Sequence, residues 1–198
     1  MRSFFLLLIV LSILSFFGLL LFFKETYLYE ASIHLGIFSL AMYLIWKKDL
    51  HTTLRSIGIP GDIKSHILYT FLGLVLVFAL LMALGLASYA LGFNDNAKVA
   101  QKIGTLPSYI ILLAIFGAPI AEELLFRAYL VPRTGIILSS IIFGAVHLAY
   151  GSVVEVVGVA LVGMILAWIF RRSKSVAPCI AIHITYNLIS ISVMRLIS

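Results

Sequence analysis

Six polar residues in the second half of the chain have side chains suited to acid–base chemistry, although apolar residues surround them. They are Glu122, Glu123, Arg127, His147, His183 and Asn187. A carboxylate and an imidazole can transfer protons near neutral pH, and imidazole or amide N–H groups can stabilise an oxyanion. Two histidines and a glutamate also match a catalytic zinc set whose fourth position holds water. These residue types indicate hydrolysis, with or without a metal ion.

The first three of these residues fall within one and a half turns of a hydrophobic segment. A charged side chain near the middle of a bilayer costs roughly 3 kcal/mol on insertion scales, so it is rarely retained without a use. Glu123 and Arg127, at i and i+4, can neutralise each other on one helical face. Glu122 points about 100° away from Glu123, so we expect it to meet a group on another helix.

His183 and Asn187 are four residues apart and share one helical face, while His147 belongs to a separate apolar segment. A single histidine in such a segment can simply hydrogen-bond a backbone carbonyl. Depths counted from the segment ends at 1.5 Å per residue are roughly 14 Å for Glu122, 20 Å for His147, 10 Å for His183 and 17 Å for Asn187. All four fall in one slab of the membrane, which predicts that they converge on one site.

The composition requires membrane-spanning helices to position these residues. Of 198 residues, 63% are hydrophobic and 11% are charged, and the mean hydropathy is +1.16. A span needs about 20 apolar residues. The expected spans are Ser3–Phe23, Thr26–Trp46, Ile67–Gly92, Pro107–Val131, Thr134–Tyr150, Ser152–Phe170 and Val176–Ile197. We therefore predict one all-α domain over 1–198, a bundle of about seven or eight helices, with the eighth element within Phe93–Leu106 or Lys47–Lys64.

The net charge of +6 follows the loops between the spans and forms no basic face, which excludes a nucleic-acid partner. The positive-inside rule favours a cytoplasmic amino terminus. We expect the protein to be an integral protein of the plasma membrane of a prokaryote. Nine basic residues would then face the cytoplasm and four the other side: Arg2, Lys47, Lys48, Arg55, Lys64, Arg133, Arg171, Arg172 and Lys174, against Lys24, Lys98, Lys102 and Arg195. Membrane lipid is thus the expected surroundings of the chain.

Two further residues bear on the site. Pro119 lacks the N–H that would bond the carbonyl of Ile115, so the fourth span should kink there and, together with Gly117, admit water or an extended peptide. Glu155, near the start of the sixth span, is expected to be solvated.

The motifs EExxxR (Glu122 to Arg127), FxxxH (Phe143 to His147) and HxxxN (His183 to Asn187) resemble, in this order, the signature of the CPBP family. This family contains the CAAX-processing and bacteriocin-processing (Abi) intramembrane endopeptidases. The resemblance covers 107–198, whereas 1–106 carries no matching motif. Asn187 is similar to the prenyl-protease version of the last motif. The resemblance implies cleavage of a membrane-anchored peptide, such as a prenylated Cys-a-a-X tail, which a cavity on the cytoplasmic side would suit.

For the reaction we expect Glu122, helped by His147, to hold and deprotonate a water, and His183 and Asn187 to donate hydrogen bonds to the oxyanion. Glu123 and Arg127 would orient Glu122. We favour a reaction without metal, and the alternative is zinc or another divalent metal held by Glu122, His147 and His183. Two other classes use the same residues: a proton-coupled transporter, and a non-catalytic immunity or scaffold protein with a structural polar core.

Overall fold

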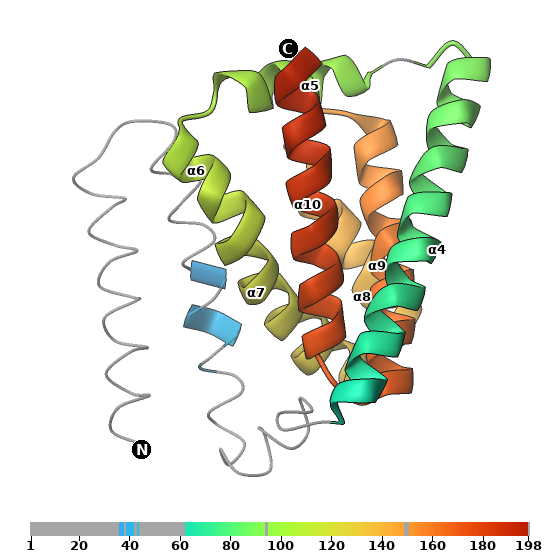
Figure 1. Ribbon diagram of the computed structural model, residues 1–198, viewed down its shortest axis with the longest axis vertical. Coiled ribbons are helices and arrows are strands. Elements are labelled where there is room, and N and C mark those ends of the chain that lie inside the picture. The colour runs from blue at the N-terminus through green and yellow to red at the C-terminus, as the bar shows by residue number, and fades with distance from the viewer. Residues whose placement is uncertain are drawn as a thin grey trace.

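The computed structural model describes residues 36–37, 39–41, 43, 62–93, 95–148 and 151–197. All regular elements in these ranges are helices, which confirms the predicted all-α class (Figure 1). Four helical stretches are long and apolar enough to cross a membrane: Ile63–Ala90, Ser108–Ala145, Val153–Ser173 and Ala177–Leu196. The predicted span Ser3–Phe23 and most of Thr26–Trp46 lie outside the described residues, as does nearly all of Lys47–Lys64.

Three of the long helices agree with predicted spans to within a few residues: α4 (Ile63–Ala90), α9 (Val153–Ser173) and α10 (Ala177–Ile197). The carboxylate of Asp62 accepts hydrogen bonds from backbone N–H groups at the start of α4, as an N-cap should. Along α4 only Gly73 and Val77 are buried. Most of its apolar surface is therefore available to lipid.

The additional element predicted within Phe93–Leu106 is the short helix α5 (Asn96–Thr105), which crosses one end of the bundle (Figure 1). Its apolar face buries Val99 and Ile103. Asp95, just before α5, accepts hydrogen bonds from the Ser152 hydroxyl at 2.8 Å and the Val153 N–H at 2.5 Å. These contacts tie α5 to the amino end of α9.

Asp95 carries a charge that this capping arrangement stabilises. Desolvation raises the pKa of its carboxyl. Hydrogen bonds from Ser152, Val153 and Val154 and the charge of Lys98 lower this pKa by a larger amount, so it lies below its ordinary value. The carboxylate also lies at the positive end of the α9 dipole. The link between α5 and α9 therefore depends on an ionised Asp95.

One long arm carries the EExxxR motif, and it is wound unevenly. It consists of α6 (Ser108–Leu112), the π-helix η1 (Leu113–Gly117), α7 (Ala118–Glu123), the π-helix η2 (Leu124–Leu130) and α8 (Val131–Ala145). The N–H of Ala118 bonds the carbonyl of Leu113, five residues back. Glu122 and Glu123 thus lie at the end of a six-residue α-helix with a wide turn on each side, and Arg127 lies in the second wide turn. Such turns are often found at functional sites.

The predicted break between the fourth and fifth spans, at Pro132 and Arg133, is in the wrong place. The helix continues through both residues and breaks at Gly135, where φ is 80° and ψ is −179°. Pro132 lies in the first turn of α8, where a missing N–H costs little. Glycine adopts positive φ without steric penalty, so it is the residue at which the chain reverses.

After this reversal, α8 packs very closely on α9. A Cβ on Gly144 would lie 2.9 Å from the backbone oxygen of Val156 and 2.8 Å from the Cβ of Ala160, too close for any side chain. A Cβ on Gly163 would lie 3.1 Å from the Phe143 ring. Small residues at a membrane-helix crossing allow this close approach. The contact fixes the end of α8 that leads to His147.

The basic residues of the described part separate towards the two ends of the bundle as expected. Lys64, Arg133, Arg171, Arg172 and Lys174 lie towards the end where α4 begins, whereas Lys98, Lys102 and Arg195 lie towards the end where α5 crosses (Figure 1). Which end faces the cytoplasm stays a prediction.

Candidate active site

Glu123 lies at the centre of a buried charge cluster. Its side chain is fully buried, and those of Arg127 and His183 are 1% and 2% exposed. Glu123 Oε1 is 2.7 Å from His183 Nδ1, and Oε2 is 3.0 Å from Arg127 Nε. The Arg127 contact is an ion pair without hydrogen-bond alignment, because neither Nε nor Oε2 has a hydrogen-bond partner among the described residues. Glu123 therefore links the EExxxR helix directly to α10.

Arg127 is also stabilised by an aromatic ring. Its guanidinium carbon lies 4.2 Å from the centroid of Phe143, within the range of a cation–π contact. Nη1 and Nη2 have no hydrogen-bond partner among the described residues. The predicted Glu123–Arg127 pair is thus present, and Phe143 of the FxxxH motif covers it from α8.

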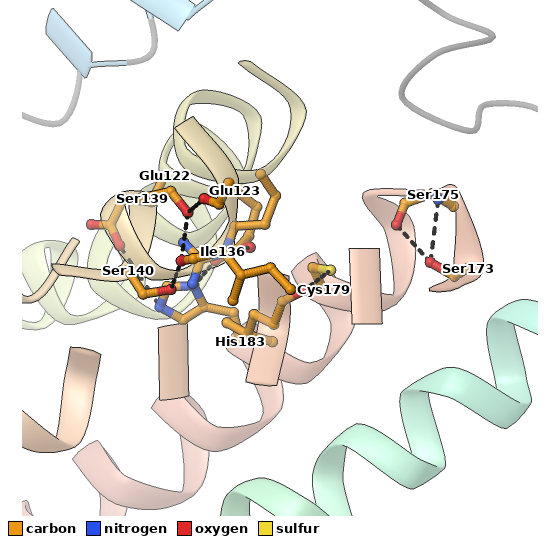
Figure 2. A network of polar contacts seen from close by, with 12 residues as sticks. Glu122, Glu123, Ile136, Ser139, Ser140, Ser173, Ser175, Cys179 and His183 are labelled. Atoms are coloured by element: carbon orange, nitrogen blue, oxygen red, sulfur yellow. Dashed lines mark hydrogen bonds and ion pairs between the residues drawn. The ribbon is translucent and has the colours of Figure 1, made fainter. Parts of the chain in front are cut away.

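Glu122 points away from that pair, as helical geometry predicts, and it too meets α10. Its side chain is 8% exposed, and Oε2 lies 3.8 Å from His183 Nε2. The two carboxylates therefore flank opposite nitrogens of one imidazole (Figure 2). A separation of 3.8 Å exceeds a direct hydrogen bond, so Oε2 and Nε2 face each other at ion-pair distance.

His147 lies in the turn after α8 and is partly exposed. Its Nδ1 lies 2.9 Å from the carbonyl of Phe143, so the tautomer that donates this bond keeps a lone pair on Nε2. The rings of His147 and His183 both pack edge-on against Phe143, with centroids 5.1 and 6.0 Å from it. The two histidines thus flank one phenylalanine.

Asn187 joins the site through the backbone of the uneven arm. Its Nδ2 donates to the carbonyl of Ala114 over 3.0 Å. In a regular α-helix the nitrogen of Pro119 would lie opposite the carbonyl of Ile115, four residues back, and we expected that carbonyl to lack its donor. In the π-helix η1 the bonds reach five residues back, so the carbonyl opposite Pro119 is that of Ala114. The Asn187 amide donates to this carbonyl.

A cavity of about 300 Å³ connects these groups. Glu122, His147, His183 and Asn187 all line it, whereas Glu123 and Arg127 lie behind them. The remaining walls come from the last third of α4, the first half of α9, the second half of α10 and α5. The cavity therefore extends from the motif residues towards the α5 end of the bundle.

Three polar residues of this cavity were not expected there. Glu155, which we expected to be solvated, lines the cavity because α9 turns that face inward, so that expectation is wrong. Tyr186 also lines it and stacks on His183 with a centroid distance of 4.9 Å. Ser190 is the third. Tyr186 follows His183 at i+3 spacing and Ser190 follows Asn187 at i+3 spacing, so the helical period of the HxxxN face would have identified them.

Glu122, His147 and His183 are the residues that could ligate a metal ion. Among the described residues, no three histidine, cysteine, aspartate or glutamate side chains are placed to hold one metal ion. One nitrogen of His183 faces Glu123, and Nδ1 of His147 faces its own helix. In this arrangement of the described residues, Glu122, His147 and His183 are not grouped as three ligands of one ion.

Comparison with known proteins identifies the family of this region. Residues 104–189 match the family model of type II CAAX prenyl endopeptidases of the Rce1-like type. This part of the chain is similar to Rce1-like domains, in agreement with the resemblance that the ordered motifs carry. The match contains all six motif residues and supports intramembrane protease activity at the level of the family. Neither a curated protein nor a solved structure gives a significant match.

Proposed function

We propose that the Rce1-like domain hydrolyses a peptide bond of a membrane-anchored substrate with a water activated by Glu122. One observation carries this proposal: the buried carboxylate of Glu122 lies 3.8 Å from His183 Nε2, in a cavity that His147 and Asn187 also line. A buried carboxylate beside an imidazole, with room for water and peptide, is the arrangement that general-base hydrolysis needs.

The first step is attack by water on the scissile carbonyl. Glu122 takes a proton from the water, whose oxygen forms a bond to the carbonyl carbon. His147, with its lone pair on Nε2, accepts the second hydrogen bond of the water and orients it. The general base and the orienting group come from α7 and the end of α8, which the close α8–α9 packing holds in place.

The oxyanion formed in this step needs donors. His183 donates from Nδ1 to Glu123, so it can also donate from Nε2 only when both ring nitrogens carry protons. The second amide hydrogen of Asn187 is the other donor. When the tetrahedral intermediate collapses, the C–N bond breaks and Glu122 returns its proton to the leaving amine.

The mechanism as proposed uses no metal ion. Purified protein should then cleave its substrate in the presence of a strong chelator. Activity that a chelator abolishes and zinc restores would refute this part of the proposal and would require Glu122, His147 and His183 to move together.

Substrate access is from the α5 end, towards which the cavity extends. The predicted orientation, with the basic end of the bundle in the cytoplasm, would put the α5 end on the other side, whereas a prenylated Cys-a-a-X tail would come from the cytoplasm. The predicted orientation and a prenylated substrate are therefore alternatives that one experiment can separate. A reporter fused after Ser198 would locate the α5 end, because α10 finishes there (Figure 1). A cytoplasmic reporter would support a prenylated substrate, and an external one would exclude it.

The decisive experiment is cleavage of a lipid-anchored peptide by the reconstituted protein. Wild type should cleave it, and Glu122→Gln and Glu122→Ala should lose at least a hundredfold in rate while their unfolding temperatures stay close to that of wild type. Glu155→Gln is the matched control, because it removes an acid of the same cavity. Its rate should stay within about threefold of wild type. If wild type cleaves nothing, or if the Glu122 variants cleave as fast as wild type, the proposed peptidase mechanism is refuted. The protein would then be a transporter or a non-catalytic scaffold.

A further inference from the structure

The uneven arm is held against α10 at two places, one on each side of Pro119. On one side the Asn187 amide bonds the carbonyl of Ala114, and on the other His183 contacts Glu122 and Glu123. His183 and Asn187 are four residues apart on one face of α10. Ala114, Ala118 and Glu122 likewise form one stripe of the arm, and all three line the cavity.

The helical turn between these two places lacks one backbone hydrogen bond. Pro119 has no N–H, so the i to i−5 ladder of η1 lacks one bond at this point, and the carbonyl of Ala114 would be unpaired within the membrane. The Asn187 amide supplies the missing donor at 3.0 Å. Because only the NH₂ end of an amide can donate to a carbonyl, this bond also fixes how the amide faces the cavity.

We infer that Asn187 is a positioning residue as well as a donor: it replaces the hydrogen bond that Pro119 removes and thereby holds α7 so that Glu122 faces His183. One amide hydrogen serves the Ala114 carbonyl, and the other remains for the oxyanion. The catalytic part of this inference rests on the proposed function, whereas the structural part does not.

The inference predicts that Pro119→Ala compensates for the loss of Asn187, because alanine restores the N–H opposite the Ala114 carbonyl. Asn187→Ala should lower the unfolding temperature in detergent by about 4 °C, the consequence of one unpaired buried carbonyl. Pro119→Ala/Asn187→Ala should regain at least half of that loss. Pro132→Ala/Asn187→Ala is the matched control, since Pro132 lies in the same arm without facing Ala114, and it should regain nothing.

Cleavage measures the positioning role separately. Asn187→Ala should lose about a hundredfold or more in kcat, in line with the loss of an oxyanion donor together with a misplaced base. Pro119→Ala/Asn187→Ala should recover about tenfold of this, with KM little changed, and Pro119→Ala alone should stay within about threefold of wild type. A residue that only donates to the oxyanion would show no recovery.

The inference is overturned if the changes in unfolding temperature of Pro119→Ala and Asn187→Ala simply add, or if the double variant is no more active than Asn187→Ala. If wild type cleaves nothing, the proposed function fails, and the unfolding measurements still decide whether Asn187 replaces the missing hydrogen bond.

Discussion

The buried charge cluster allows the most quantitative prediction, because stability rather than activity reports on it. Glu123 and Arg127 are almost completely buried, and Glu123 is the only carboxylate that contacts the guanidinium among the described residues. Replacing Glu123 by glutamine leaves an arginine charge without a counter-ion inside the bundle. Removing one partner of a buried pair typically costs about 3–5 kcal/mol.

Replacing both partners should cost far less. In Glu123→Leu/Arg127→Met the uncompensated charge is gone, and apolar side chains of similar volume fill the space, a change that is often neutral or stabilising. The remaining loss is the hydrogen bond between Glu123 and His183, worth about 1 kcal/mol. The double variant should therefore be more stable than Glu123→Gln by about 2 kcal/mol or more.

The assay is equilibrium unfolding of the purified protein in mixed detergent micelles, followed by loss of helical signal. Thr185→Ala is the control, because among the described residues its hydroxyl bonds the carbonyl of Ala181 in its own helix, and it should cost less than about 1 kcal/mol. If Glu123→Gln costs no more than this control, or if the double variant is the less stable of the two, the reasoning about an isolated buried arginine is wrong.

Three other changes test separate parts of the bundle. Gly144→Leu should prevent α8 from packing on α9 and reduce the yield of folded protein, whereas Gly85→Leu, with open space around it, should fold like wild type in the same size-exclusion assay. Phe143→Leu removes the ring over Arg127 and should lower unfolding stability by about 2 kcal/mol, and a loss below about 0.5 kcal/mol would contradict the cation–π contact. Because the pKa of Asp95 is lowered in the folded state, its stabilising contribution is present above the pKa of the unfolded chain and is lost as pH falls through the folded value. Wild type should thus exceed Asp95→Asn in stability at pH 6 and converge with it on acidification, and a constant difference between pH 6 and pH 3 would show that ionisation of Asp95 is irrelevant.

Hydropathy and helical periodicity were sufficient for the architecture and for part of the site. They predicted α4, α9 and α10 closely, placed an additional element where α5 lies, and directed Glu122 towards another helix. They also predicted that Glu122, His147, His183 and Asn187 converge, and these four residues line one cavity; their roles in a reaction stay predictions. These predictions succeeded because the period of a helix and the thickness of a bilayer constrain them strongly.

The remaining features depend on packing that no local pattern encodes. The wide turns around α7 shift the carbonyl opposite Pro119 from Ile115 to Ala114, and such turns have no reliable sequence signal. We expected Glu155 to be solvated because it lies near a helix end. The side of α9 that faces the cavity is instead set by the packing of α9 against α8. The position of the break, at Gly135 rather than Pro132, depends on backbone conformation in the assembled bundle.

The wide turns on either side of α7 have a consequence for how this region tolerates length changes. Each contains one residue more than an α-helical turn needs, so deleting a single residue from 113–117 can be absorbed by rewinding that turn as ordinary α-helix. The flanking helical segments would then keep their relative orientation. If the deleted residue is one of 115–117, the Ala114 carbonyl becomes the one four residues before Pro119, so it still lies opposite the proline nitrogen and within reach of Asn187. A one-residue gap at 115–117 is therefore expected to keep both the Asn187 contact and the position of Glu122.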